Sequence, residues 1–384
     1  MKTILSTLLI AFLISTSASA QYSKVENIEI ESEELNQTRE VMVYTPFGYD
    51  DEYKFYNVIY VFDAQNRGLF DYVTSLSSLN QEHSIIVGIK ATTIYEEVDG
   101  KKTWVYARNS DLLPKGTKRL GGREGNLDGF LAYVKNEVIP YVESNYRTLP
   151  ERMAIGHSLS ASFVVYALTQ RPDMFDNYVA VSPNLKYDDE FLLNKLKTLE
   201  PENFSATKHL YMSHADEATW GWEASNQEAY ALLRDRLQSE NFQVKIEEYP
   251  DKGHMTSYIP AVSSALNNFF EEIKPEWKNR LSEETYEVTI KLNVVNEEDE
   301  AYIFGNQEPL ANWQKDKIKM KKTGPLTREI TLNIHSHAEV QFSTDGENLA
   351  WISLGEMGRT NWPRMIKPEN GKTYTFELVE NKPF

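Results

Sequence analysis

Apolar and polar positions follow two alternating periods along residues 40–270. Short apolar runs, typical of strands buried on both faces, alternate with segments whose apolar residues recur at helical spacing. The expected strands are 40–46, 57–63, 84–89, 152–156, 178–182, 209–213 and 244–249, and the expected helices are 127–145, 159–170 and 226–237. This order predicts an α/β fold with a mostly parallel sheet and helices on both faces.

The pattern changes near residue 277, where segments of helical period give way to short alternating strands. These strands are expected at 286–292, 301–304, 328–332, 339–342 and 374–378. Regular short strands separated by turn residues predict a small all-β sandwich. We therefore expect an α/β domain over 21–276, a linker over 277–284 and a sandwich domain over 285–384. The alternative is a last helix that runs directly into the second domain.

The first twenty residues have the pattern of an export signal. Lys2 precedes an apolar run over 4–14, and Ala18-Ser19-Ala20 places small residues where a signal peptidase reads them. Because the run is too short to span the hydrocarbon core of a bilayer, we expect cleavage rather than a membrane anchor. The sequence thus predicts an exported protein, periplasmic or extracellular.

Composition narrows the chemistry. The chain has 384 residues, of which 41% are hydrophobic and 25% charged, as in soluble globular proteins. It contains no cysteine, which excludes disulfides, thiol catalysis and thiolate metal sites. Its formal net charge of −17 repels phosphate backbones, so nucleic acid is not an expected partner.

The sharpest local pattern is Gly156-His157-Ser158-Leu159-Ser160, between an expected strand and an expected helix. A serine on such a tight turn has its hydroxyl pushed out of the sheet edge, and small neighbours let strand and helix approach each other. We predict that Ser158 is a nucleophile. The alternative is a serine that only caps the helix.

A serine nucleophile needs a base that accepts its proton and an acid that orients the base. In the chain order of α/β-hydrolases the acid follows the serine and the histidine comes last, on a late loop. His254, after the last expected strand, fits the base. Three acids precede it in the turn after strand 209–213. We favour Glu217, with Asp216 second and Glu223 third.

An oxyanion hole needs two donors aimed at the developing charge. One is expected to be the backbone N–H of Leu159, the residue after the nucleophile. The second is expected in the turn after strand 57–63, from the N–H of Ala64 or Gln65. This chemistry requires no metal and no organic cofactor.

Residues 25 to about 275 resemble the putative esterase family of α/β-hydrolases, which contains enterochelin esterases, feruloyl esterases and S-formylglutathione hydrolase. The matching segments are 39–46, 58–63, 86–89, 108–112, 156–160 and 249–254. The resemblance implies a triad of Ser158, His254 and an acid near Glu217.

Two segments depart from the family's pattern. Members usually carry Gly-His-Ser-x-Gly-Gly at the nucleophile, where this chain has Ser160-Ala161, and often Asp-Gly where it has Asp63-Ala64. Neither change removes a catalytic group, but both alter the expected acyl pocket.

The C-terminal part resembles a starch-binding-type carbohydrate-binding module. The segment 304–313 is similar to that family's glycine, asparagine and tryptophan pattern, and Trp351 and Asn361 fall near its second tryptophan and following asparagine. The resemblance implies that Trp313 and Trp351 stack on sugar rings. The alternative is that these tryptophans, with Trp362, fill the sandwich core.

Together these patterns predict a secreted serine esterase. The expected substrate is a small-molecule or glycan ester: an acylated or feruloylated glycan, or a siderophore ester. An acyltransferase with the same triad is one alternative, because it differs only in the acceptor of the acyl group. A non-catalytic glycan-binding protein is the other, and the presence of both Ser158 and His254 argues against it.

Overall fold

The computed structural model describes residues 23–49, 54–80, 83–106, 108–117, 124–278, 280–355 and 358–380. The expected export signal lies outside these residues. Within them, no helix is long and apolar enough to cross a membrane.

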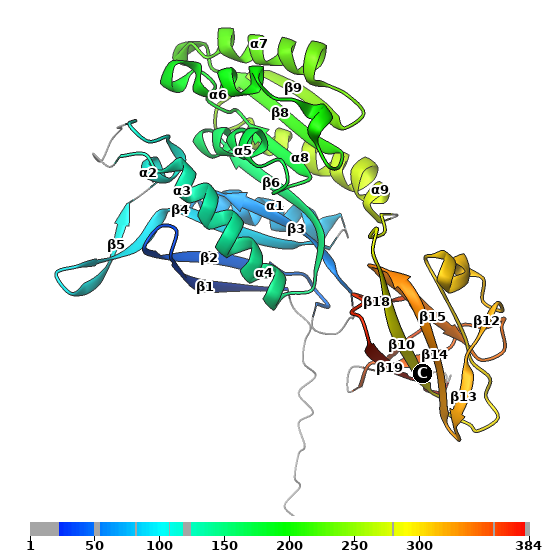
Figure 1. Ribbon diagram of the computed structural model, residues 1–384. Helices are drawn as coiled ribbons and strands as arrows, with labels where there is room; N and C mark the ends of the chain where they lie inside the picture. The colour runs from blue at the N-terminus through cyan, green and yellow to red at the C-terminus, as the bar shows by residue number, and fades with distance from the viewer. Residues whose placement is uncertain are drawn as a thin grey trace, which may run out of the picture.

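The described residues 24–253 build one nine-stranded sheet (Figure 1). Its strands are β1 (Lys24–Ser32), β2 (Gln37–Thr45), β3 (Tyr56–Phe62), β4 (Ile85–Val98), β5 (Lys101–Tyr106), β6 (Thr148–His157), β7 (Asn177–Val181), β8 (Lys208–Asp216) and β9 (Phe242–Gly253). The order is β1-β2-β4-β3-β6-β7-β8-β9, with β5 paired to β4. The run from β4 to β9 is parallel, and β1, β2 and β5 add antiparallel pairs. The predicted α/β fold is confirmed.

Helices cover both faces of this sheet (Figure 1). They are α1 (Arg67–Leu79), α2 (Arg108–Leu112), α3 (Leu127–Tyr133), α4 (Ile139–Asn145), α5 (Leu159–Gln170), α6 (Tyr187–Lys197), α7 (Glu223–Leu232), α8 (Tyr258–Asn268) and α9 (Lys274–Lys278). Three π-helical turns join or extend them: Val134–Val138, Leu233–Leu237 and Phe269–Ile273.

The central strand β3 explains the continuous apolar runs. Its seven residues are all buried, because successive side chains point to opposite faces and both faces are covered. Tyr60 and Phe62 join the apolar cluster beneath α3 and α5, whereas Ile59 and Val61 join the cluster beneath α1 and α8. A central strand of this kind therefore leaves a continuous apolar run in the sequence.

The helical segment after β9 runs further than expected. It continues through α9 to Lys278, because Trp277 is buried and its ring packs 5.0 Å from that of Phe269. The first two residues of the expected linker are thus helical. The helix ends before the next strand, which starts at Thr285, so it does not run directly into the second domain.

Two four-stranded sheets follow, stacked around their own apolar core. Their orders are β13-β14-β10-β19 and β12-β11-β15-β18, and β16 pairs with β17 beside them. The strands are β10 (Thr285–Asn293), β11 (Tyr302–Gly305), β12 (Ile318–Lys319), β13 (Lys321–Gly324), β14 (Thr327–His335), β15 (Ala338–Ser343), β16 (Ile352–Ser353), β17 (Arg359–Thr360), β18 (Arg364–Ile366) and β19 (Lys372–Glu377). This agrees with the predicted sandwich.

Candidate active site

Ser158 stands on a strained turn between β6 and α5. Its backbone has φ 61° and ψ −123°, a region that residues with a side chain rarely occupy. Every other residue from 153 to 168 is buried, so the turn presents Ser158 alone to solvent. A Cβ atom on Gly156 would lie 2.3 Å from the carbonyl oxygen of Ser160, which explains the glycine.

Ser160, the departure from the family's glycine, ties this turn together. Its buried hydroxyl accepts a hydrogen bond from the His157 N–H at 3.0 Å and donates to the His157 carbonyl oxygen at 2.9 Å. The serine therefore fits the tight approach of strand and helix and adds two hydrogen bonds across it.

His254 and Glu217 meet at the ends of β9 and β8. The ladder between these strands pairs Asp216 with Gly253, which places the next residue of each strand side by side. His254 Nδ1 lies 2.8 Å from Glu217 Oε1, and the Glu217 side chain is fully buried. An acid held in this way orients the imidazole and stabilises its positive charge.

The other two acids lie elsewhere. Asp216 is exposed, and its carboxylate accepts a hydrogen bond from the Ala218 N–H at 3.3 Å. Glu223 begins α7 and is half-buried. Of the three predicted acids, Glu217 is the one that the structure brings to His254.

His157 links the nucleophile turn to the loop of the base. Burial lowers the pKa of its imidazole to about 4, so the ring is neutral at pH 7. Its Nε2–H donates to the carbonyl oxygen of His254 at 2.8 Å, and the Ser257 hydroxyl donates to the same oxygen at 3.0 Å. His157 thus holds the backbone of His254 in place.

Of the two candidates for the second oxyanion donor, Ala64 and Gln65, the structure leaves Gln65. The N–H of Ala64 donates to the Ile89 carbonyl oxygen at 3.1 Å, so this candidate is corrected: the sheet ladder already uses that donor. Gln65 remains and lines the same cavity as Ser158 and Leu159. Leu159 begins α5, where the first N–H groups lack partners within the helix.

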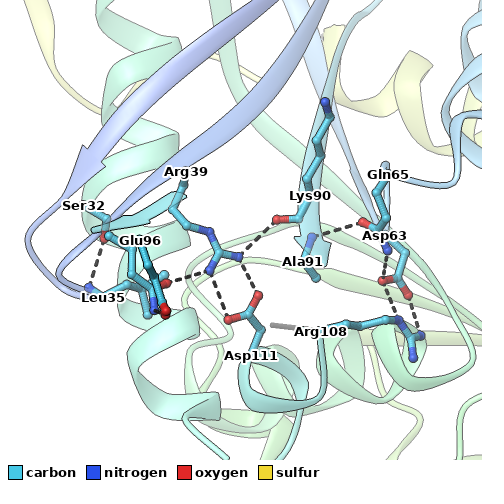
Figure 2. A network of polar contacts seen from close by, with 11 residues as sticks. Ser32, Leu35, Arg39, Asp63, Gln65, Lys90, Ala91, Glu96, Arg108 and Asp111 are labelled. Atoms are coloured by element: carbon cyan, nitrogen blue, oxygen red, sulfur yellow. Dashed lines mark hydrogen bonds and ion pairs between the residues drawn. The ribbon is translucent and has the colours of Figure 1, made fainter. Parts of the chain in front are cut away.

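The turn that carries Gln65 is fastened by side-chain contacts that the sequence did not predict (Figure 2). Asp63 has φ 61° and is held by the Arg108 guanidinium through two contacts, of 2.8 and 2.6 Å. Gln65 Nε2 donates to Asp63 at 2.7 Å, and Gln65 Oε1 accepts from the Ala91 N–H at 3.1 Å. Arg108 belongs to the segment 108–112, one of those that carry the family resemblance.

A cavity of about 660 Å³ joins these groups at the edge where the parallel strands end. Ser158 and His254 line it together with Trp220 and Trp222. The Trp220 ring lies 4.4 Å from that of His254 and 4.8 Å from that of Trp222, measured between centroids. Trp220 is 47% exposed. This aromatic wall was not predicted from the sequence, although the segment Trp220-Gly221-Trp222 lies between the predicted acid and base.

The C-terminal tryptophans lie in the β-sheet part of the chain, outside this cavity. Trp313 is 40% exposed, Trp362 is 66% exposed, and Trp351 is half-buried under the Arg359 guanidinium at 4.8 Å. The apolar core of the two sheets includes none of the three among its described residues, so the core-filling alternative is wrong.

In the part of the chain that the structure describes, no three His, Cys, Asp or Glu side chains are placed to bind a metal ion.

Comparison with known proteins defines the class. The model of the family described as "Putative esterase" matches residues 32–254, which is more than half of the chain. The chain belongs to this family, and it is a serine ester hydrolase of the α/β-hydrolase type.

Individual relatives agree with this assignment. The chain is 26% identical over 231 residues to the ferri-bacillibactin esterase BesA of Bacillus subtilis, covering 55% of this chain and 78% of that protein. It is 30% identical over 104 residues to the siderophore triacetylfusarinine C esterase of Aspergillus fumigatus, covering 26% and 34%.

Solved structures agree in fold. An IroE-like serine hydrolase from Shewanella oneidensis superposes with a TM-score of 0.53 at 22% identity, covering 65% of this chain and 80% of that one.

Proposed function

We propose that the chain hydrolyses a carboxylic ester through Ser158, His254 and Glu217. The observation that carries the proposal is one cavity that holds a serine on a strained turn and a histidine bonded to a buried glutamate. In this mechanism His254 takes the proton of the Ser158 hydroxyl as its oxygen attacks the ester carbonyl. The N–H groups of Leu159 and Gln65 receive the developing oxyanion.

The second half of the reaction uses the same groups. Protonated His254 gives its proton to the leaving alcohol, which departs and leaves an acyl-enzyme on Ser158. Water then attacks with His254 as base, releasing the acid and restoring the serine. Glu217 holds the imidazole in place and stabilises the imidazolium that forms.

We propose a siderophore ester as the substrate. The relatives support this choice, because both of those named above are esterases of siderophores. The cavity wall also carries two adjacent indole rings, which suit a planar group in a siderophore ester or in a feruloyl ester. Aromatic rings bind planar groups by stacking, which favours an ester whose acyl or alcohol part has a flat ring. We further propose that the protein is exported, as the segment 1–20 predicts.

A substrate panel tests this choice. A siderophore trilactone is expected to give a higher kcat/KM than an acetylated or feruloylated glycan. Trp220→Ala is expected to lower kcat/KM for the trilactone by roughly fivefold to tenfold, because stacking contributes about 1 kcal/mol. Trp313→Ala, at a tryptophan of similar exposure, is the matched control and should change nothing.

The same panel discriminates the alternatives. Preference for a glycan ester together with a loss in Trp313→Ala would transfer the function to glycan esters. A transfer product formed with a sugar or alcohol acceptor would identify an acyltransferase. Activity on no ester at all would leave the binding-only alternative.

The C-terminal β-sheets are expected to be dispensable for the chemistry. They contact the residues before β3, where the Phe55 N–H lies 3.4 Å from Met365 Sδ and Lys54 Nζ lies 5.5 Å from the Trp362 ring centre. The turn with the oxyanion donor, residues 63–65 (the oxyanion turn), follows the other end of β3. At strand spacing it lies roughly 25 Å away.

Truncation after residue 280 keeps Trp277 and is expected to leave kcat/KM for p-nitrophenyl acetate within about twofold of the full chain, as for distant independent sites. Kinetics and thermal unfolding of the purified fragment measure this. An insoluble fragment would show that the β-sheets complete the hydrolase core and would contradict the proposed domain boundary.

A further inference from the structure

Arg39 and Asp111 form an ion pair that is buried away from the cavity. Their side chains are 0% and 3% exposed, and two contacts of 3.2 and 2.5 Å join them. Neither lines the cavity. Burying two charges costs desolvation that their attraction often only offsets, so stability alone is a weak reason for this pair.

One route leads from the pair to the oxyanion turn through α2. Asp111 and Arg108 lie three residues apart on this short helix. Asp111 fastens it to Arg39 on β2, and Arg108 fastens it to Asp63, directly after β3 (Figure 2). The helix is therefore fixed from both sides.

A second route runs along β4. The Arg39 guanidinium donates to the carbonyl oxygen of Lys90 at 3.1 Å, and the next N–H, that of Ala91, donates to the Gln65 side chain. Gln65 in turn donates to Asp63. The two routes meet at the turn, so the contacts close a ring through Arg39 (Figure 2).

This ring of contacts encloses the oxyanion turn, whose backbone conformation at Asp63 is strained. Asp63 has a positive φ although it is not glycine, and such a conformation persists only where its surroundings determine it. An oxyanion donor also works only if it is aimed before the charge develops. A small misplacement of the Gln65 N–H would therefore reduce the rate without preventing substrate binding.

We propose that Arg39 and Asp111 are positioning residues that hold the Gln65 N–H in place for the oxyanion, acting through Arg108 and the β4 backbone; this rests on the proposed function of Ser158. The pair touches no substrate. Its effect reaches the turn through hydrogen bonds and the backbone segments of α2 and β4 that connect them.

Asp111→Asn is the test, because it keeps the side-chain volume and removes the charge that holds α2. With p-nitrophenyl acetate, kcat is expected to fall at least tenfold while KM stays within about twofold, the pattern of an interaction made only in the transition state. The matched control is Asp176→Asn, which weakens another largely buried pair, with Lys208 at 2.9 Å. The control should lower the unfolding temperature and leave kcat unchanged.

The outcomes separate two failures. An Asp111→Asn enzyme with wild-type kcat, beside an inactive Ser158→Ala enzyme, would overturn the positioning role alone. An active Ser158→Ala enzyme would overturn the proposed function. Should Asp111→Asn fail to fold, Arg39→Lys replaces it, because a lysine cannot make the two contacts to Asp111, and residue 39 lies outside the cavity. The same split between kcat and KM is required there, and its absence would equally overturn the role.

Discussion

Replacing Ser158 by alanine is expected to lower kcat for p-nitrophenyl acetate by at least three orders of magnitude, the scale of losing a nucleophile from a triad. The acyl-enzyme cannot form without the hydroxyl, so only binding and the oxyanion donors remain to assist direct attack by water. The unfolding temperature should hardly move, because the Ser158 side chain makes no capping hydrogen bond to α5.

Two measurements accompany this substitution. A fluorophosphonate probe should label the wild-type chain and not Ser158→Ala. Ser264→Ala is the matched control, since it removes a hydroxyl that donates to Glu247 at 2.7 Å, outside the cavity. It should keep full activity. A Ser158→Ala enzyme that retained a tenth of the wild-type rate would refute the nucleophile.

Glu217→Gln is expected to lower kcat by roughly three to four orders of magnitude, as when the acid of a triad becomes an amide. An amide neither fixes the tautomer of His254 well nor stabilises its positive charge. Asp216→Asn makes the same chemical change one residue earlier on an exposed side chain, and it should cost less than about threefold, as for a surface substitution.

Steady-state kinetics of the two variants decide the assignment of the acid. The opposite ranking would move the acid to Asp216. A large effect of Glu223→Gln alone would move it to the start of α7.

The central strands could be predicted because burial on both faces leaves a continuous apolar run, as in β3. The edge strand β1 and the short strands β16 and β17 could not. In β1 most side chains are at least partly exposed, so no apolar run marks it. Strands of two residues such as β16 and β17 are too short to repeat the two-residue period of a strand.

Two parts of the site could be predicted from the sequence: the turn that carries Ser158 and the base His254 on the loop after the last strand. The acid remained a choice of three because the pairing of β8 with β9 shifts register between Ala215 and Asp216. Because of this shift, residues 250–252 have no partners on β8, and Glu217 comes to lie beside His254. No local sequence pattern predicts such a shift. The hydrogen bond that removes Ala64 as a donor likewise depends on where β4 lies in the sheet.

The C-terminal sheets lie beside the first residues of β3, and this position bears on how proteins of this kind change in evolution. The C-terminal sheets contact Phe55, just before β3, whereas the catalytic groups lie beyond the last residue of β3. The whole length of this buried strand separates the two. Recombination between Lys278 and Thr285 can therefore exchange one accessory module for another without disturbing the catalytic edge. We expect lineages of this family to differ more in the modules beyond α9 than in the turns around Ser158.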